Sequence, residues 1–187
     1  MKKIISAFLV VAFSFVLFAC NQKISNNNSD SQANTKPSVD DALNVSIEVP
    51  EDWNAFPDNI NGNPSRDYIS PSKDGKFSIE RISIIEVPIS EETTLESFTT
   101  SNIERQESNY KDKSFEIISP AQDVKAGSFD GMNAVFSYTE GTLTIVVDLT
   151  FVVTDNTAYI IMCNTTDDSY DDYKDIFAKA RETFKIN

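Results

Sequence analysis

Histidine is absent from the 187 residues, and cysteine occurs only twice. The missing histidine excludes His-based catalytic triads, His general bases and His metal ligands. Two cysteines allow at most one disulfide. Basic residues are also scarce, since 16 Lys and Arg stand against 29 Asp and Glu, a net charge of −13. Such an acidic chain is a poor candidate for binding nucleic acid or for a polybasic contact with a membrane.

Motifs of the common hydrolases and nucleotide-binding enzymes are missing as well. The sequence contains no G-x-S-x-G and no P-loop. A glycosidase needs only two carboxylates in a cleft, but no such pair stands out. We therefore expect no enzyme and no cofactor, with a hydrolase as the least favoured alternative. The length suits one domain, and 40% hydrophobic residues, including 13 Phe, can form its core.

The first twenty residues are typical of an export signal. Two lysines precede an apolar run at 4–18, which is shorter than a membrane-spanning helix. Residues 17–20 (LFAC) resemble a bacterial lipobox, although Phe18 is bulkier than the usual residue there. The resemblance implies a signal peptide at 1–19, with diacylglycerol and palmitate on Cys20. It also implies a lipid-anchored protein on the extracytoplasmic face of the cell membrane. The alternative is an ordinary signal peptide with an incidental cysteine.

Residues 20–43 are expected to form the lipidated cysteine and a disordered tether. Asn, Ser, Asp, Gln and Lys dominate residues 21–40, so this stretch cannot bury enough surface to offset its backbone entropy. We expect it to act as a spacer, with a partner-binding segment as the alternative. If Cys20 carries lipid, Cys163 is left alone and the mature chain has no intrachain disulfide.

A single domain is expected over residues 44–187. In its first half, stretches with a clear helix or strand pattern of apolar residues alternate with stretches in which this pattern is weak. Thr94 is placed to cap a helix that ends near Asn109. In the strand expected over 77–89, the apolar residues change from odd positions (Phe77, Ile79) to even positions (Ile82, Ile84). This change predicts a bulge near Arg81. The other expected elements are a strand at 45–49, a long loop or short hairpin at 54–76, and a short strand at 115–118.

The second half is predicted to be an antiparallel meander followed by a helix. Apolar residues alternate over 132–138 and 143–153, and 158–163 is apolar throughout. Apolar side chains on both faces predict that both faces are covered. The last helix has its apolar stripe at Tyr170, Tyr173, Phe177, Ala180 and Phe184, with Asp167, Asp168 and Ser169 as its cap and N-terminal charge.

Three stretches in this order resemble the PsbP-like superfamily, which includes the envelope protein DcrB. They are residues 45–53 (VSIEVPEDW), residues 127–131 (GSFDG) and the strand at 159–165 with the helix after it. The resemblance covers about residues 44–187. It implies an α+β fold, a three-layer α/β/α sandwich whose mainly antiparallel central sheet is flanked by helices. It carries no functional residue, because no metal or partner motif matches.

Three groups of residues are candidate sites, each with a plainer alternative. The acidic face Asp168–Asp175 could bind a divalent cation, but its spacing fails the EF-hand pattern and it lies opposite the apolar stripe, so we favour a solvated face. Cys163 is expected to be a buried hydrophobe and not a nucleophile. Trp53, Phe56 and Tyr68 could line a ligand groove, although we favour a core position for them.

These observations favour a non-catalytic binding or adaptor module on the membrane surface, with an envelope protein as its partner. A lipoprotein that binds a small ligand or a divalent cation is the alternative. The only site residue that we predict outright is Cys20, as the point of lipid attachment; no catalytic, cofactor or metal residue is assigned.

Overall fold

The computed structural model describes residues 43–72 and 78–187. The predicted signal peptide, Cys20 and the predicted tether up to residue 42 lie outside these residues. Leu43, the last residue of the predicted tether, is buried with 5% of its surface exposed. The packed domain therefore includes at least one residue before position 44. Within 43–72 and 78–187, no helix has both the length and the apolar character needed to span a membrane.

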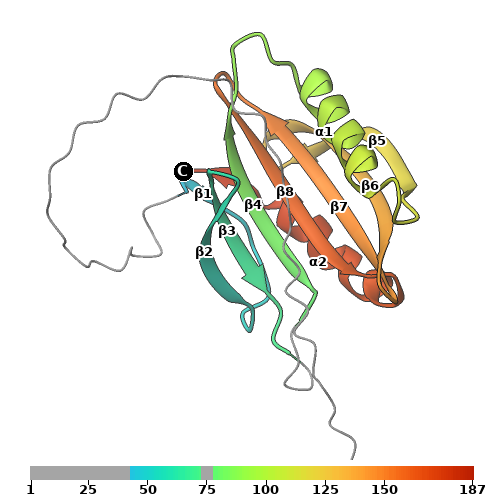
Figure 1. Ribbon diagram of the computed structural model, residues 1–187. Helices are drawn as coiled ribbons and strands as arrows, with labels where there is room; N and C mark the ends of the chain where they lie inside the picture. The colour runs from blue at the N-terminus through green and yellow to red at the C-terminus, as the bar shows by residue number, and fades with distance from the viewer. Residues whose placement is uncertain (1–42, 73–77) are drawn as a thin grey trace, which may run out of the picture. The chain divides into compact units, whose positions relative to one another are not determined.

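A seven-stranded antiparallel sheet forms the centre of the domain (Figure 1). Its strand order is β2-β3-β4-β8-β7-β6-β5, and every neighbouring pair is antiparallel. The chain builds the β2–β4 side first, crosses to the far edge through α1, and returns as the meander β5–β8. The strands are β2 (Asn54–Ile60), β3 (Asn63–Ile69), β4 (Arg81–Pro88), β5 (Glu116–Ala126), β6 (Phe129–Glu140), β7 (Leu143–Val153) and β8 (Thr157–Thr166).

Two helices accompany the sheet. The helix α1 (Leu95–Tyr110) begins at the predicted cap, where Thr94 and Ser97 form a reciprocal capping box. The helix α2 (Tyr170–Glu182) follows a single 3₁₀ turn, η1 (Asp167–Ser169). The predicted side-chain cap of α2 is wrong, because Ser169 makes no capping hydrogen bond. The predicted α+β class with a central antiparallel sheet is confirmed.

Both faces of the central strands are covered, as their two-sided apolar pattern predicts. Neighbouring residues of a strand point to opposite faces. On β7, the Phe151 ring lies 6.0 Å from the Phe98 ring of α1, whereas Val152 packs into the cluster that contains Phe177 and Phe184. The two helices therefore cover opposite faces, α1 mainly over β6 and β7, and α2 over β5, β7 and β8 (Figure 1).

Of the two alternatives expected at 54–76, the structure shows the hairpin: β2 and β3 are joined by the turn Asn61-Gly62, whose φ angles are 56° and 84°. An Asn-Gly pair is the typical sequence of such a turn, so this signal was available. The bulge expected near Arg81 is absent, since β4 pairs with β8 in one unbroken register. The register shifts lie in β5 instead, one between Ile117 and Ser119 and one between Ser119 and Gln122, which contains Pro120.

The first predicted strand is much shorter than expected. Only β1 (Val45–Ser46) forms, and it pairs with β9 (Lys185–Ile186) at the other end of the domain's chain. Residues 47–50 run on beside α2, where Glu48 accepts an ion pair from Lys179 at 3.4 Å. This pairing ties the beginning of the domain to its end.

Candidate functional site

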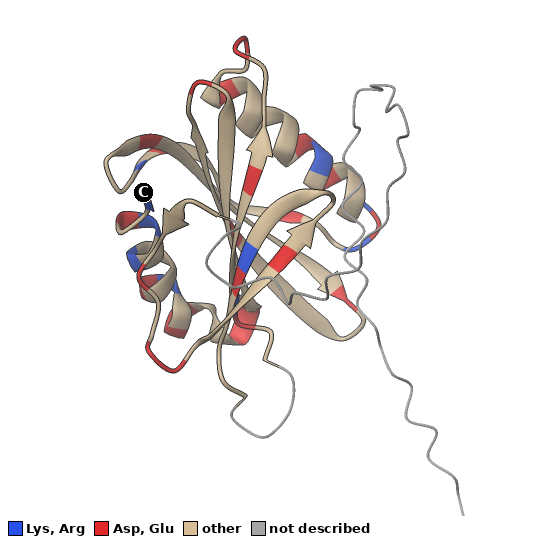
Figure 2. Ribbon diagram, turned by 90° about the vertical axis from the view of Figure 1, so that its left-hand side faces the viewer, with Lys and Arg blue, Asp and Glu red and all other residues tan. Residues whose placement is uncertain are grey.

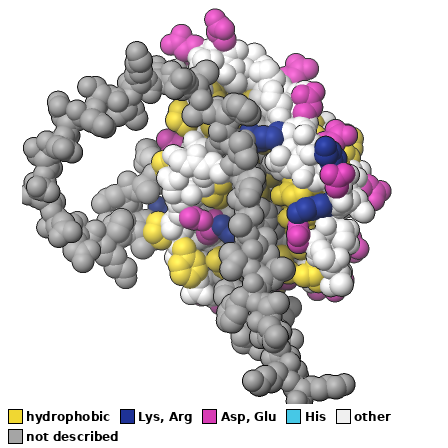
Figure 3. Space-filling view, in the orientation of Figure 1, with side chains coloured by type: hydrophobic (Ala, Val, Ile, Leu, Met, Phe, Trp, Pro, Cys, Tyr) yellow, Lys and Arg dark blue, Asp and Glu magenta, His cyan; other side chains and the backbone are white. Residues whose placement is uncertain are grey.

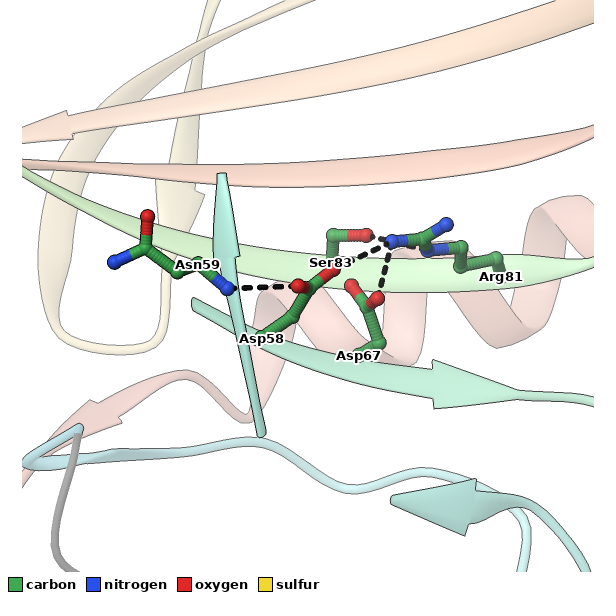
Figure 4. Close-up of polar contacts among 5 residues, drawn as sticks. All are labelled: Asp58, Asn59, Asp67, Arg81 and Ser83. Atoms are coloured by element: carbon green, nitrogen blue, oxygen red, sulfur yellow. Dashed lines mark hydrogen bonds and ion pairs between the residues drawn. The ribbon is translucent and has the colours of Figure 1, made fainter. Parts of the chain in front are cut away.

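Polar side chains gather on the same face of the sheet as α1. They lie over strands β2, β3 and β4, whereas α1 covers mainly β6 and β7. Asp58 of β2, Asp67 of β3, and Arg81 and Ser83 of β4 converge there (Figure 4). We call these four residues the Arg81 cluster. The strand registers explain the gathering: Asp67 pairs with Ser83, and Ser83 pairs with Met162 of β8 on the face of α1.

Arg81 is the centre of this cluster. Its guanidinium donates hydrogen bonds to Asp67, to Asp58 Oδ2 at 3.4 Å and to Ser83 Oγ at 3.1 Å. Burial raises the pKa of the Asp67 carboxyl above its usual value, and the Ser83 hydroxyl and the Arg81 charge oppose that rise. Asp67 is only 4% exposed, whereas the Asp58 side chain is 46% exposed. The cluster thus joins a buried carboxylate to the surface.

Within the described residues, six buried polar side-chain atoms have no hydrogen-bond partner, and three of them belong to strands on this face. These three are Ser65 Oγ, Asp67 Oδ1 and Asn164 Oδ1. Asn164 pairs with Arg81 across β8 and β4, and Ser65 lies two residues before Asp67 on β3. Buried polar atoms are nearly always hydrogen-bonded, because leaving one unpaired costs about 1–3 kcal/mol. All three atoms are shielded from solvent, so they belong to the interior of this face and not to its exposed surface.

The distribution of charged side chains does not mark a second face of the domain as a candidate site. Acidic positions are spread over loops, strands and helix ends in Figure 2. In the space-filling view, most visible basic side chains lie beside acidic ones, with apolar atoms between them (Figure 3). The balance of the Arg81 cluster, two carboxylates against one guanidinium, follows the net negative charge of the chain.

A second buried polar group lies on the opposite face, under α2. The side-chain amide of Asn133 donates to Asp148 Oδ1 at 2.5 Å and to Thr150 Oγ1 at 3.1 Å. Burial raises the pKa of Asp148, and Asn133 and Arg181 lower it. Asp148 pairs in register with Cys163, whose thiol pKa burial also raises well above its usual value. A thiol of raised pKa is a poor nucleophile, which agrees with the prediction for Cys163.

The aromatic groove that we considered does not form. Trp53 and Tyr68 are 9% and 8% exposed and belong to the core, where the Trp53 ring lies 6.2 Å from the Tyr173 ring. Phe56 is 48% exposed and lies on the other face of the sheet, since it pairs in register with Asp67. The favoured core position is therefore confirmed for Trp53 and Tyr68 and is wrong for Phe56.

The acids of α2 lie on its exposed side, as predicted. Asp171, Asp172 and Asp175 are exposed, and Asp171 accepts an ion pair from Lys174 at 2.7 Å. Asp168 accepts a hydrogen bond from the Thr166 hydroxyl, at 2.5 Å. Among the residues that the structure describes, no three acidic or Cys side chains gather into a group that could hold a metal ion.

Sequence reasoning missed the Arg81 cluster because it left 54–76 open between a loop and a hairpin and gave β3 no bounds. Once 63–69 is taken as a strand, the alternation of Ser65, Arg66, Asp67 and Tyr68 places Ser65 and Asp67 on one face. The Asn-Gly pair at 61–62 was the signal that could have found this strand. No local signal brings Asn164 beside Arg81, because that neighbourhood is made by the β4–β8 pairing.

Comparison with known protein families identifies the family of the domain. Residues 38–186 match the family described as the serine/threonine kinase C-terminal domain. The chain belongs to this family. The kinase C-terminal domain family was not foreseen from the sequence. Without histidine, these 187 residues contain no His-Arg-Asp catalytic-loop motif of a protein kinase. No curated protein matches the chain.

Solved structures of low sequence identity share the fold of this kinase C-terminal domain. The cyanobacterial PsbP of Synechocystis matches with a TM-score of 0.60 and 12% identity, over 84% of this chain and 98% of that chain. LpqN of Mycobacterium tuberculosis, a protein involved in cell envelope biogenesis, matches at 0.53 and 15%, over 76% and 83%. A protein of unknown function from Pseudomonas aeruginosa matches at 0.52 and 11%, over 70% and 80%. The predicted PsbP-like fold is confirmed.

Proposed function

We propose that this chain is a lipid-anchored, extracytoplasmic binding or adaptor module without catalytic activity. In this proposal, residues 1–19 are removed as a signal peptide and Cys20 receives diacylglycerol and palmitate. Residues 20–43 form the tether, and a three-layer α/β/α domain recognises an envelope protein. Two acyl chains hold a protein on a membrane far more firmly than one.

The observation that carries the proposal is the exposed surface beside the Arg81 cluster, where the Phe56 ring, 48% exposed, and the Asp58 side chain, 46% exposed, lie on one face of β2. An exposed aromatic ring beside an arginine is typical of a protein–protein interface. The family, described as a serine/threonine kinase C-terminal domain, is compatible with a recognition role. LpqN, a neighbour in fold, is described as acting in cell envelope biogenesis.

The anchor can be tested with the two cysteines of the chain as a matched pair. Cys20→Ala should release the protein from the membrane fraction and abolish incorporation of labelled palmitate. Cys163→Ala should change neither, because Cys163 is buried in the domain. Retention of Cys20→Ala on the membrane, or palmitate on that variant, would remove the anchor from the proposal.

The binding role can be tested by site-specific photo-crosslinking in living cells. A photoreactive phenylalanine analogue replaces Phe56, which is exposed beside the Arg81 cluster, or Leu143, which is exposed to a similar extent at the start of β7. We expect one discrete crosslinked product from position 56 and none from position 143. Equal products at the two positions, or none at either, would count against a specific partner on this face.

A further inference from the structure

A groove on the α2 side of the sheet has no part in the proposed function. It has a volume of about 320 Å³ and lies between residues 48–50 and α2. Its lining residues are Glu48, Val49 and Pro50 on one side and Asp175, Ile176 and Lys179 on the other. The groove is therefore separate from the Arg81 cluster, which lies on the face of the sheet that carries α1.

The groove begins just past the point where residues 48–50 are tied to α2. At that point the N–H of Glu48 donates to Thr183 Oγ1 at 2.8 Å, and its carboxylate pairs with Lys179 at 3.4 Å. Two residues later, Pro50 has no N–H to donate, and its carbonyl accepts a hydrogen bond from the Trp53 N–H at 3.1 Å. The backbone of Pro50 therefore does not close the gap to α2.

The walls of the groove are apolar and are supported from behind. Val49 and Ile176 are half-buried, and both pack against the core cluster that contains Trp53 and Phe177. The ring of Pro50 fixes its own backbone angle φ, and Ile176 is held by the helix. A partner therefore meets a groove that is already formed, which lowers the entropy cost of binding.

The charged side chains at the rim leave one negative charge unpaired. Lys179 pairs with Glu48, and both side chains are more than half exposed. Asp175 has no ion-pair partner among the residues that the structure describes, and the neighbouring Lys174 is engaged with Asp171 at 2.7 Å. A cationic group next to the apolar walls therefore complements the Asp175 side of the groove.

The size of the groove favours a protein segment over a small molecule. Pockets that bury most of a small ligand have volumes of about 300–1,000 Å³, and this groove is at the lower limit with an exposed rim. It can instead bury one large apolar side chain, as at the centre of a protein–protein interface.

A second copy of the domain offers no suitable side chain on its described surface. The large hydrophobic side chains that are exposed there have no Lys or Arg next to them in the sequence; they are Phe56, Ile117, Ile118 and Leu143. The charge and the apolar walls together therefore favour a different protein as the partner.

We propose that this groove binds a segment of a partner protein in which a leucine or phenylalanine stands next to a lysine or arginine. The apolar side chain lies between Pro50 and Ile176, and the basic side chain pairs with Asp175. The inference goes beyond the proposed function, because it adds a second contact surface on the face opposite to Phe56. With two surfaces, one domain is able to hold two proteins together.

Calorimetric titration of the full chain in non-ionic detergent, with detergent alone as the blank, tests the proposal. The probes are acetylated and amidated peptides. Gly-Lys-Leu-Lys-Gly has both features, Gly-Lys-Ser-Lys-Gly lacks the apolar side chain, Gly-Gln-Leu-Gln-Gly lacks the charge, and Gly-Glu-Leu-Glu-Gly reverses it. We expect saturable binding of the first peptide, about tenfold weaker binding without the leucine and about threefold weaker binding without the charge. The peptide of reversed charge should bind most weakly. No saturable binding of the first peptide, or equal binding of any other, would overturn the inference.

Variants of the full chain separate the groove from general attraction to an acidic protein. Asp175→Lys should weaken binding of Gly-Lys-Leu-Lys-Gly and strengthen binding of Gly-Glu-Leu-Glu-Gly, a reversal that loss of folding cannot produce. Ile176→Ala should weaken binding of both peptides. Glu104→Lys is the matched control, because it reverses one exposed charge on α1, on the opposite face of the sheet. Equal effects of Asp175→Lys and Glu104→Lys would overturn the groove as the site.

Sedimentation of the full chain in the same detergent tests for a second copy as the occupant. We expect Asp175→Lys and Ile176→Ala to leave the oligomeric state unchanged. A dimer that either variant dissociates would assign the groove to a second copy and overturn the proposed partner segment. Neither result bears on the proposed function, because the crosslink at position 56 reports on the opposite face.

Discussion

Gly127, in the turn between β5 and β6, is expected to be one of the most sensitive positions of the domain. Its φ is +56°, and a Cβ at this residue would lie 1.9 Å from the backbone oxygen of Phe184. Its own N–H donates to the carbonyl oxygen of Arg181 at 2.9 Å. The turn therefore lies directly against the chain that leaves α2. Gly127→Ala should force these two segments apart.

Gly141 provides the matched control. It has a φ of +64°, close to that of Gly127, but no atom lies within 4 Å of its added Cβ. Gly141→Ala should therefore cost only the left-handed backbone strain, about 1 to 2 kcal/mol. Gly127→Ala adds the loss of a hydrogen bond, about 1 kcal/mol. It also adds part of the packing of Phe184, a fully buried ring whose complete loss would cost about 3 to 5 kcal/mol. We expect Gly127→Ala to exceed Gly141→Ala by about 2 to 4 kcal/mol.

Urea unfolding measures this difference, since the fluorescence of Trp53, the only tryptophan, reports on the core that contains Phe184. Free energies of unfolding follow from linear extrapolation. In a chain of this length, the expected difference would also separate the melting temperatures by about 4 to 16 °C. If the two variants lose the same stability within about 0.5 kcal/mol, the close approach of the turn to Phe184 is refuted.

Four further measurements test other parts of the domain. Phe177→Ala should cost about 3 to 5 kcal/mol in urea unfolding, because this ring is 1% exposed between α2 and the sheet; a loss below 1 kcal/mol would contradict that packing. Thr94→Ala removes the cap of α1 and should cost about 0.5 to 2 kcal/mol in the same assay. The Cys163 thiol, with its raised pKa, should resist iodoacetamide at about pH 8 until the chain is denatured; rapid native alkylation would argue against its burial. Burial also raises the pKa of Asp148, so the folded chain holds this proton more tightly than the unfolded chain, and stability falls as the pH rises from 3.8 through the folded pKa. Asp148→Asn should reduce that fall in melting temperature between about pH 4 and 8, and an unchanged pH profile would refute the assignment.

Elements with a strong local pattern were predicted almost residue by residue. The alternation over 143–153 coincides with β7, and the helix capped by Thr94 ends within one residue of its predicted end. The stripe of α2 was predicted equally well, since Tyr173, Phe177 and Ala180 are its buried residues. Each of these signals lies within one element, so no distant part of the chain is needed to interpret it.

Elements stabilised mainly by distant partners were predicted poorly. The strands β2 and β3 contain Pro, Asn and Asp, which are disfavoured in strands, yet they form because β3 pairs with β4. The β1–β9 pairing joins residues about 140 positions apart. Propensity is a weak guide where tertiary pairing supplies the hydrogen bonds.

The sequence by itself determined the acidic character of the chain, the lack of histidine chemistry, the α+β class and the order of elements that resembles PsbP. These properties depend on composition and on local periodicity. Only the tertiary structure decided which side chains meet. Phe56, Asp67, Arg81 and Asn164 come from four strands, and the register of those strands places them on one face. A shift of one residue in any strand would turn its side chain to the opposite face, so the candidate site exists only in the folded sheet.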